Sequence, residues 1–167
     1  VTQADDAPTG SGFQHSFKID CTTADASLAA SDFMTISTQL EGQDLQMFKK
    51  GTANAEKRTI SFWVKATKTG TNILEVDDND NGRSISQAYT ISSANTWEKK
   101  VLSFDADTTG AFDNDNASSL RLFWWLGAGS NYQSGTLATS WASTTNANRV
   151  VGQVNNADST DNNWQIT

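Results

Sequence analysis

Short runs in which apolar and polar residues alternate are the feature that most restricts the fold of this chain. In residues 60–65 and 120–126 every even position is apolar, whereas the odd positions include serine, lysine and arginine. A period of two is typical of a strand that buries one face, so both segments predict strands with the even positions in the core. The predicted core positions are Ile60, Phe62, Val64, Leu120, Leu122, Trp124 and Leu126.

Other segments with a strand-like pattern are separated by polar loops. They span residues 13–19, 33–40, 72–76, 84–91, 97–104, 150–154 and 164–166. The acidic loop between the third and the fourth of these ends in Asn81-Gly82, which is a strong signal for a β-hairpin. Only residues 42–50 have a pattern that suits one or two helical turns.

These elements predict an all-β fold, an antiparallel β-sandwich or jelly roll with at most one short helix. Parallel βαβ units are excluded because the chain lacks the crossover helices that they need. Residues 1–12 are polar and are expected to form an N-terminal arm or linker, and residues 13–167 are expected to form one β-sandwich domain. The last strand is expected to be cut short, because no turn follows it before Thr167.

The charge of the chain limits its partners. It has 12 Lys and Arg residues and 19 Asp and Glu residues, which gives a formal net charge of −7. Nucleic-acid binding needs cations that displace phosphate counterions, so no nucleic-acid partner is expected, and an anionic membrane surface is disfavoured for the same reason. No apolar run reaches the roughly 18 residues of a membrane span, so no membrane insertion is expected.

Residues for catalysis are scarce. Cys21 is the only cysteine and His15 the only histidine, so no internal disulfide can form and a Ser-His-Asp or Cys-His site would have to include His15. Glycosidases need two carboxylates at a defined separation, and neither the four Glu residues nor the Asp-rich turns mark out such a pair. We therefore predict that the chain is not an enzyme and has no catalytic residues.

Two acidic loops carry oxygen ligands that suit a hard cation. The hairpin loop contains Asp77 and Asn79, and a later loop contains Asp113 and Asp115. The first loop matches the opening of an EF-hand, but its twelfth position is Ala88, where an EF-hand needs glutamate. Each loop is therefore either a solvated turn or part of a structural calcium site, and no cofactor is expected to be required.

Aromatic side chains lie on the predicted outer faces of two strands, beside polar and cationic residues. A sugar stacks its CH face on an aromatic ring while its hydroxyl groups bond to polar neighbours, so this arrangement suits a glycan-binding surface. The alternative is that the rings are buried beneath a second layer, a loop or a neighbouring subunit. The candidate glycan-binding residues are Trp63, Lys65, Arg121, Phe123, Trp125, Tyr132 and Trp141, and an exposed platform of Trp63 and Trp125 is expected at their centre.

Seven stretches form a recognisable set: Asp6–Phe13, Cys21–Ser27, Gln39–Gln43, Ser61–Lys65, Ser93–Lys100, Ala147–Gln153 and Asn163–Thr167. As a set they resemble a domain of tail-fibre and other virion proteins of marine phages, which is similar in organisation to the jelly rolls of carbohydrate-binding modules. The resemblance covers most of the chain. It implies a carbohydrate-binding-module-like sandwich for residues 13–167, and it brings no catalytic motif.

These observations predict a non-catalytic virion or tail-fibre module that binds host-surface glycans during phage adsorption. The expected partners are a host-surface polysaccharide or glycan and other virion subunits, with a homotrimer as one arrangement in a fibre. The expected location is extracellular, in the tail or an appendage of the virion. Two alternatives stay open: a carbohydrate-binding module of a secreted polysaccharide-degrading enzyme, and a purely structural fibre or capsid-decoration domain without a ligand.

Overall fold

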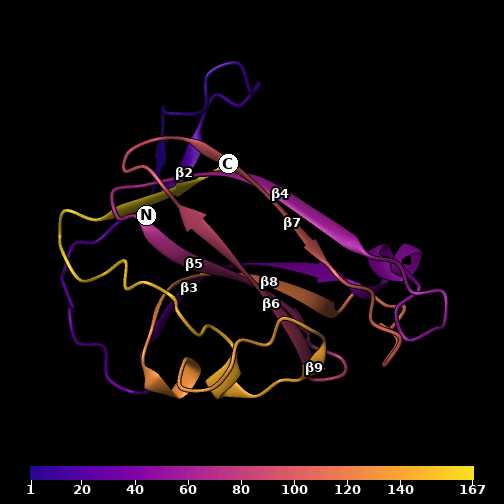
Figure 1. Cartoon of the computed structure of the whole chain (residues 1–167). Helices are drawn as coiled ribbons and strands as arrows, with labels where there is room; N and C mark the ends of the chain where they lie inside the picture. The colour runs from indigo at the N-terminus through magenta and orange to yellow at the C-terminus, as the bar shows by residue number, and fades with distance from the viewer.

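A computed structural model describes all residues 1–167 and shows two antiparallel sheets packed face to face (Figure 1). Each sheet has five strands. Sheet I has the order β1-β2-β10-β4-β7, with β1 (Thr2–Ala4), β2 (Ser16–Asp20), β10 (Asn163–Ile166), β4 (Arg58–Ala66) and β7 (Glu98–Phe104). Sheet II has the order β3-β8-β5-β6-β9, with β3 (Phe33–Glu41), β8 (Ser118–Ala128), β5 (Gly70–Asp78), β6 (Arg83–Ile91) and β9 (Ala142–Ser143). The predicted all-β sandwich is confirmed.

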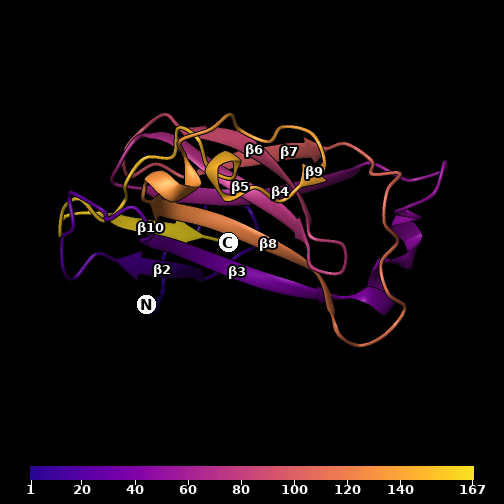
Figure 2. The same ribbon diagram turned by 90° about the horizontal axis from the view of Figure 1, so that it is seen from below.

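The core lies between the two sheets, on the inner faces of the strands. The even positions of β4 and β8 that were predicted to point inward are buried there or pack against the buried residues, which confirms the alternation. The ring of Phe62 meets those of Tyr89 and Trp124 edge to face, with centroids 5.2 and 5.7 Å apart. Such contacts hold β4 of sheet I against β6 and β8 of sheet II. Figure 2 shows β3, β8 and β5 side by side in sheet II.

The predicted hairpin is present, but its strands are longer than expected. β5 and β6 pair in register as far as Asp78 and Arg83, and only residues 79–82 form the loop. Gly82 has a φ of +60°, in the left-handed region that a tight turn between strands often requires. Asp77 is therefore a strand residue with its side chain on a face of sheet II, and the expectation that it lies in the loop is wrong.

The strand predicted at residues 13–19 begins later than expected. β2 starts at Ser16. The alternation in residues 13–19 predicts one buried face that contains Phe13 and Phe17, and this prediction is wrong because both are exposed. The late start follows from pairing, because β1 meets β2 from Ser16 onward and β10 meets it from Phe17 onward. The N-terminal arm is joined to the domain, because residues 2–4 form β1 at the edge of sheet I.

The strand predicted at residues 150–154 is a turn. Val150 is buried, but the chain reverses after it and Gly152 has a φ of +91°, which breaks any ladder. Val150 packs against Ile73 and Trp125 on the outer face of sheet II. The short edge strands β1 and β9 are missing from the predicted set, because three and two residues are too few to show an alternation.

The helix predicted near residues 42–50 is a 3-10 helix, η1 (Gly42–Phe48). Two single 3-10 turns, η2 (Ser130–Tyr132) and η3 (Asn146–Asn148), lie in the long segment that follows β8. None of these helices has the length and apolarity needed to cross a membrane.

Candidate functional site

The odd positions of β8 lie on the outer face of sheet II, as the alternation predicts. The strand register places Phe123 between Glu75 of β5 and Ser37 of β3. The same register places Arg121 beside Asp77. Aromatic, cationic and acidic side chains therefore occupy neighbouring rows of one sheet face.

Three aromatic side chains gather on this face around a fourth, Trp125. The ring centroids of Phe33, Tyr132 and Phe123 lie 5.8, 5.6 and 6.4 Å from that of Trp125. Only 1% of Trp125 is exposed, whereas 54% of Phe33 is exposed, and Phe123 and Tyr132 are half-buried. We call Phe33, Phe123 and Tyr132 the aromatic strip, and Trp125 is the floor beneath it.

A buried ion pair holds this floor in place. Arg149 donates from Nε and Nη2 to the two carboxylate oxygens of Glu75, at 2.8 and 2.9 Å, and Trp125 Nε1 donates to Glu75 Oε2 at 3.0 Å. Burial raises the pKa of Glu75, although hydrogen bonds from Arg149 and Trp125 oppose the rise. The Arg149 guanidinium also lies 5.6 Å from the Phe123 ring centroid and 5.1 Å from that of Trp125. The bidentate pair therefore holds the Trp125 ring in place on sheet II.

Arg121 is the cation of this face that reaches solvent. Its Nε and Nη2 donate to Asp77 Oδ2 at 2.9 and 2.6 Å, and its guanidinium lies 5.4 Å from the Phe123 ring centroid. Its side chain is 35% exposed. Asp77 thus positions a cation at the edge of the aromatic strip, where its remaining N–H groups can donate to a ligand.

The segment from residue 129 to residue 150 covers one half of the outer face. Ser86 of β6 donates its backbone N–H to Ala138 O and its hydroxyl to Arg149 O, which ties the segment down over β5 and β6. In Figure 1 this orange and yellow segment runs beneath sheet II. The half along β3 has no such cover, and Ser37 and Gln39 are exposed there.

The aromatic strip has one member that the sequence analysis missed. Phe33 begins β3, and its side chain shares a face with Thr35, Ser37 and Gln39, which pair with Trp125, Phe123 and Arg121. The odd positions of β3 could have been recognised as one outer row from the sequence. However, only the strand order of sheet II shows that this row of β3 lies beside β8.

The predicted glycan-binding residues do not form one surface. Arg121, Phe123, Trp125 and Tyr132 share the outer face of sheet II, whereas Trp63 and Lys65 belong to β4 of sheet I and Trp141 lies at the end of the sandwich. The expected platform of Trp63 and Trp125 is wrong, because Trp125 is buried and the two residues lie on the outer faces of opposite sheets. Lys65 is paired with Asp6 of the arm, and Trp141 Nε1 donates to Asp105 O at 2.8 Å.

The residues predicted to bind calcium have other partners or point into solvent. Asp77 is engaged by Arg121, while Asn79 and Asp115 bond to nearby backbone groups, and Asp113 is exposed. No group of three or more His, Cys, Asp or Glu side chains in the structure could hold a metal ion. The four residues are therefore not assembled into a calcium site.

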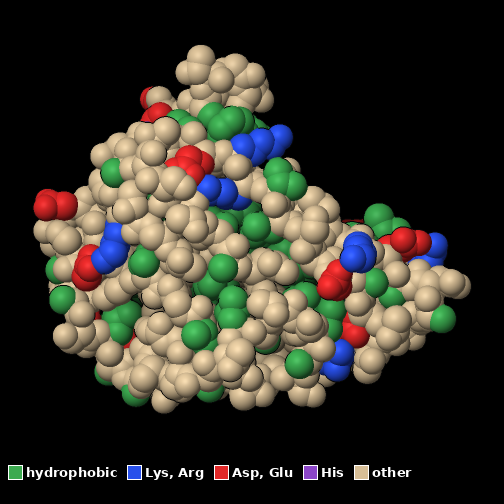
Figure 3. Space-filling model, viewed as in Figure 1, with side chains coloured by type: hydrophobic (Ala, Val, Ile, Leu, Met, Phe, Trp, Pro, Cys, Tyr) green, Lys and Arg blue, Asp and Glu red, His purple; other side chains and the backbone are tan.

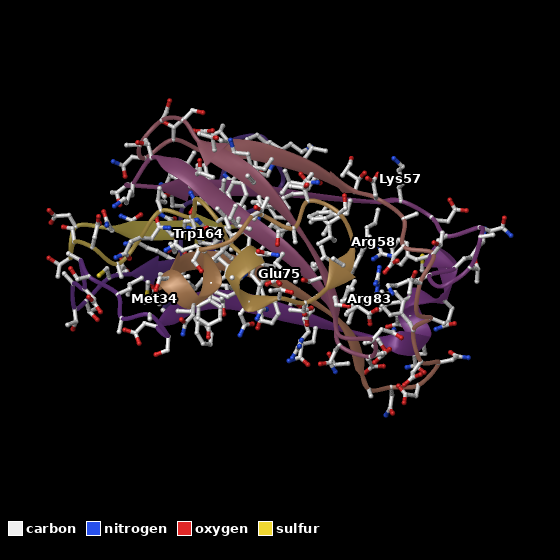
Figure 4. The ribbon with its side chains drawn as sticks, turned by 60° about the horizontal axis from the view of Figure 1, so that its bottom comes forward. Met34, Lys57, Arg58, Glu75, Arg83 and Trp164 are labelled. Carbon is white, nitrogen blue, oxygen red and sulfur yellow. The ribbon has the colours of Figure 1, made fainter.

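A buried ionic cluster that the sequence did not predict lies at the end of the sandwich beside η1. Lys50 has no exposed side-chain surface, and its Nζ lies 2.5 Å from Asp78 Oδ2 and 3.1 Å from Asp107 Oδ2. Arg83 donates from Nε and Nη2 to both oxygens of Asp107, at 2.8 and 3.0 Å. Figure 4 shows Arg83 together with Arg58 at this end, and Figure 3 shows charged side chains of both signs on the lobe beside it.

Arg58 completes this end of the core through its aromatic neighbours. Its guanidinium lies 4.6 Å from the ring centroid of Phe48 and 5.5 Å from that of Trp141. Burial lowers the pKa of Arg58, while the charges of Asp107 and Asp78 raise it. The cluster joins loops that are far apart in the sequence, so its role is to hold η1 and its neighbouring loops to the sandwich.

Acid should weaken the buried ionic cluster. Burial raises the pKa of Asp107, but hydrogen bonds from Arg83, the Thr109 N–H and Lys50 outweigh burial and leave that pKa below its ordinary value. A carboxyl with a depressed folded pKa stabilises the fold above its unfolded pKa of about 3.9, and this contribution is lost as the pH falls through the folded pKa. We expect the free energy of unfolding, measured in urea between about pH 5 and about pH 2, to fall less steeply for Asp107→Asn than for the unchanged protein. Equal slopes would contradict this assignment.

Comparisons of the chain with known protein families, with curated proteins and with solved structures found no match. The strand order and the buried inner faces define it as an antiparallel β-sandwich. The outer face of sheet II is its candidate binding surface.

Proposed function

We propose that the chain is a non-catalytic glycan-binding module and that the aromatic strip is its binding surface. The observation that carries this proposal is the exposed ring of Phe33 beside the half-buried rings of Phe123 and Tyr132, on a sheet face that no loop covers along β3. Sugar rings stack their CH faces on such rings. The surface is open, as a polysaccharide chain requires.

Polar groups beside the strip supply hydrogen bonds in the right place. Ser37 and Gln39 of β3 are exposed in the row next to Phe123 and Arg121. Hydroxyl groups of a stacked sugar would bond to these side chains, and Arg121 would donate to hydroxyl or carboxylate oxygens of the glycan. The aromatic rings would contact the apolar CH face of a sugar, and the polar side chains beside them would bond to its hydroxyl groups.

The surface is also rigid before any ligand arrives. Trp125 is fixed between Glu75, Arg149 and the rings above it, and Arg121 is held by Asp77. A preorganised surface loses less conformational entropy on binding, so weak stacking contacts contribute more of their energy to affinity. This favours a binding surface over a purely structural one.

The resemblance of the sequence to marine phage tail-fibre and virion domains supports a place for this module on a virion appendage. There it would bind host-surface polysaccharide during adsorption, alongside other virion subunits. The same surface would serve a carbohydrate-binding module of a secreted enzyme, and the class of glycan bound would distinguish the two. Nothing in the proposal requires a catalytic residue.

Phe33→Ala is expected to weaken glycan binding with little effect on folding. Loss of one stacking ring should cost about 1–3 kcal/mol of affinity, by analogy with bases stacked on aromatic side chains, or roughly 5- to 150-fold in Kd. Phe33 is 54% exposed, so its removal opens little of the core. A glycan array on the isolated chain would identify a bound glycan, and titration calorimetry would then compare the variants.

The matched control is Val101→Ala, at an exposed apolar position on the outer face of sheet I. It should bind the glycan as the unchanged protein does. If Trp63→Ala abolishes binding while Phe33→Ala leaves it intact, the glycan site lies on sheet I and the aromatic strip is not the binding surface. If the array finds no glycan at all, the chain is a structural module.

A further inference from the structure

A cavity of about 220 Å³ opens at the end of the sandwich opposite the buried ionic cluster. Its apolar wall comes from both sheets, because Ile19 and Trp164 belong to sheet I and Met34 and Leu126 to sheet II. Figure 4 shows Met34 and Trp164 at this end of the molecule, opposite Arg83. All four apolar residues belong to the core or pack against it, so the cavity leads inward between the two sheets.

One buried polar atom beside the cavity has no partner. Asn156 lines the cavity and is only 7% exposed. Its backbone N–H and its Nδ2 both donate to Leu126 O, at 2.8 and 3.0 Å, and Nδ2 also donates to Asn72 Oδ1 at 3.0 Å. These bonds turn the amide nitrogen toward sheet II and leave Oδ1 as an acceptor that no group of the protein reaches. A buried acceptor without a donor is costly, so a ligand that donates to it would remove that cost.

Internal segments of the chain form this cavity. β10 begins at Asn163 beside the cavity and runs away from it, and none of residues 1–18 lines it. The end of β2, the loop after it, β3, β8 and the segment before β10 supply the lining. The opening is therefore a property of the packed sandwich and does not depend on either terminus.

The lining indicates the chemistry of a ligand. No Lys or Arg lines the cavity, and Asp20 at its exposed rim is already paired with Lys18 at 2.8 Å, so the lining favours a neutral molecule. The thioether of Met34 and the ring of Trp164 are both groups that pack well against an aromatic ring. An apolar cavity of roughly 150 Å³ holds benzene, so this one has space for a second fused ring.

We propose that the cavity binds a small neutral aromatic molecule, of the indole or phenol class, whose N–H or O–H group donates to Asn156 Oδ1. The ring would lie against Met34 and Trp164. A sugar suits this site poorly, because hydroxyl groups surround its ring and several would lose their hydrogen bonds against the apolar wall. The site is separate from the aromatic strip, which lies on the outer face of sheet II, and it does not depend on the glycan-binding proposal.

Indole is the probe, and the thiol of Cys21 is the reporter. Cys21 lines the cavity, is half-buried, and is the only cysteine of the chain, so alkylation by iodoacetamide reads out this place alone. Indole should slow the alkylation in a saturable way, by about tenfold at about ten times its Kd. In a titration followed by NMR, the side-chain NH2 signals of Asn156 should shift with the same Kd.

Benzofuran is the matched control ligand. It has the size and shape of indole, but a ring oxygen replaces the N–H group, so it cannot donate to Asn156 Oδ1. It should bind at least about fivefold more weakly, because the buried acceptor stays unpaired. Equal binding of the two ligands would overturn the proposed hydrogen bond.

Met34→Trp tests the site from the side of the protein, because the larger side chain would fill the cavity. The matched control is Met47→Trp, the same change at a position of η1 that is 69% exposed. Met34→Trp should weaken indole binding by at least about tenfold, and Met47→Trp should leave it unchanged. The comparison of indole with benzofuran keeps the test decisive even if Met34→Trp fails to fold.

Three further results would overturn the proposal. If indole shows no saturable binding, Asn156 Oδ1 is served by water and the cavity is not a ligand site. A loss of binding in Met47→Trp that equals the loss in Met34→Trp would place the indole elsewhere. Tighter binding of N-acetyltryptophanamide than of indole would show that the cavity takes a tryptophan side chain of a partner polypeptide instead of a free small molecule.

Discussion

Replacing Trp125 with alanine is expected to lower the free energy of unfolding by about 3–5 kcal/mol. The side chain is only 1% exposed and packs against Ile73 and Val150, so alanine would leave a cavity between sheet II and its covering segment. Its Nε1 also donates to Glu75, and the carboxylate would lose that bond while staying buried. Urea unfolding followed by circular dichroism would measure the change.

The control for this prediction is Trp63→Ala, which removes the same side chain from the outer face of sheet I. Trp63 is only half-buried, so its loss should cost less than about 2 kcal/mol. A similar cost for both variants would mean that the segment after β8 does not seal Trp125 from water. The aromatic strip would then lack its rigid floor.

Lys50→Met is expected to destabilise the fold by about 3–5 kcal/mol as well. The methionine would keep most of the packing of the lysine stem but would leave Asp78 and Asp107 buried without the cation that lies between them. A buried charge that loses its partner keeps its desolvation cost, which is why the expected effect is large. The measurement is again the free energy of unfolding in urea.

Lys57→Met is the matched control, since it changes the charge of the chain equally. Lys57 is 73% exposed and pairs with an exposed Asp105, so its removal should change stability by no more than about 0.5 kcal/mol. Figure 4 shows Lys57 directed away from the body of the protein. Equal effects of the two variants would show that net charge, rather than the buried ionic cluster, determines the loss.

Local patterns in the sequence predict much of this fold because strand geometry is local. The side chains of successive residues must point to opposite faces, so the alternation in β4 and β8 identified the inner rows correctly. The hairpin between β5 and β6 was found from its turn residues, and η1 from a short helical pattern. Where the pattern lay in an unpaired segment, as at Phe13, the prediction of burial was wrong.

The candidate site shows the limit of such patterns. Alternation placed Trp63 and Trp125 correctly on outward rows, but it contains no information on which sheet each strand joins or on what covers it. Phe33 entered the strip because β3 pairs with β8, across more than eighty residues of chain. Lys50, Asp78 and Asp107 meet because the segments that follow η1 and β7 converge on the last residue of β5 at one end of the sandwich.

The sequence by itself determined the fold class, the inner faces of the main strands and the shortage of catalytic groups. All of these follow from residue types and from a spacing of two residues, which the backbone imposes wherever a strand forms. Only the tertiary structure decided which outward rings are open and which acidic residues are bound by buried cations. Those features depend on strand order and on the placement of loops. Both arise from the packing of the whole chain, because they bring together residues that are distant in the sequence.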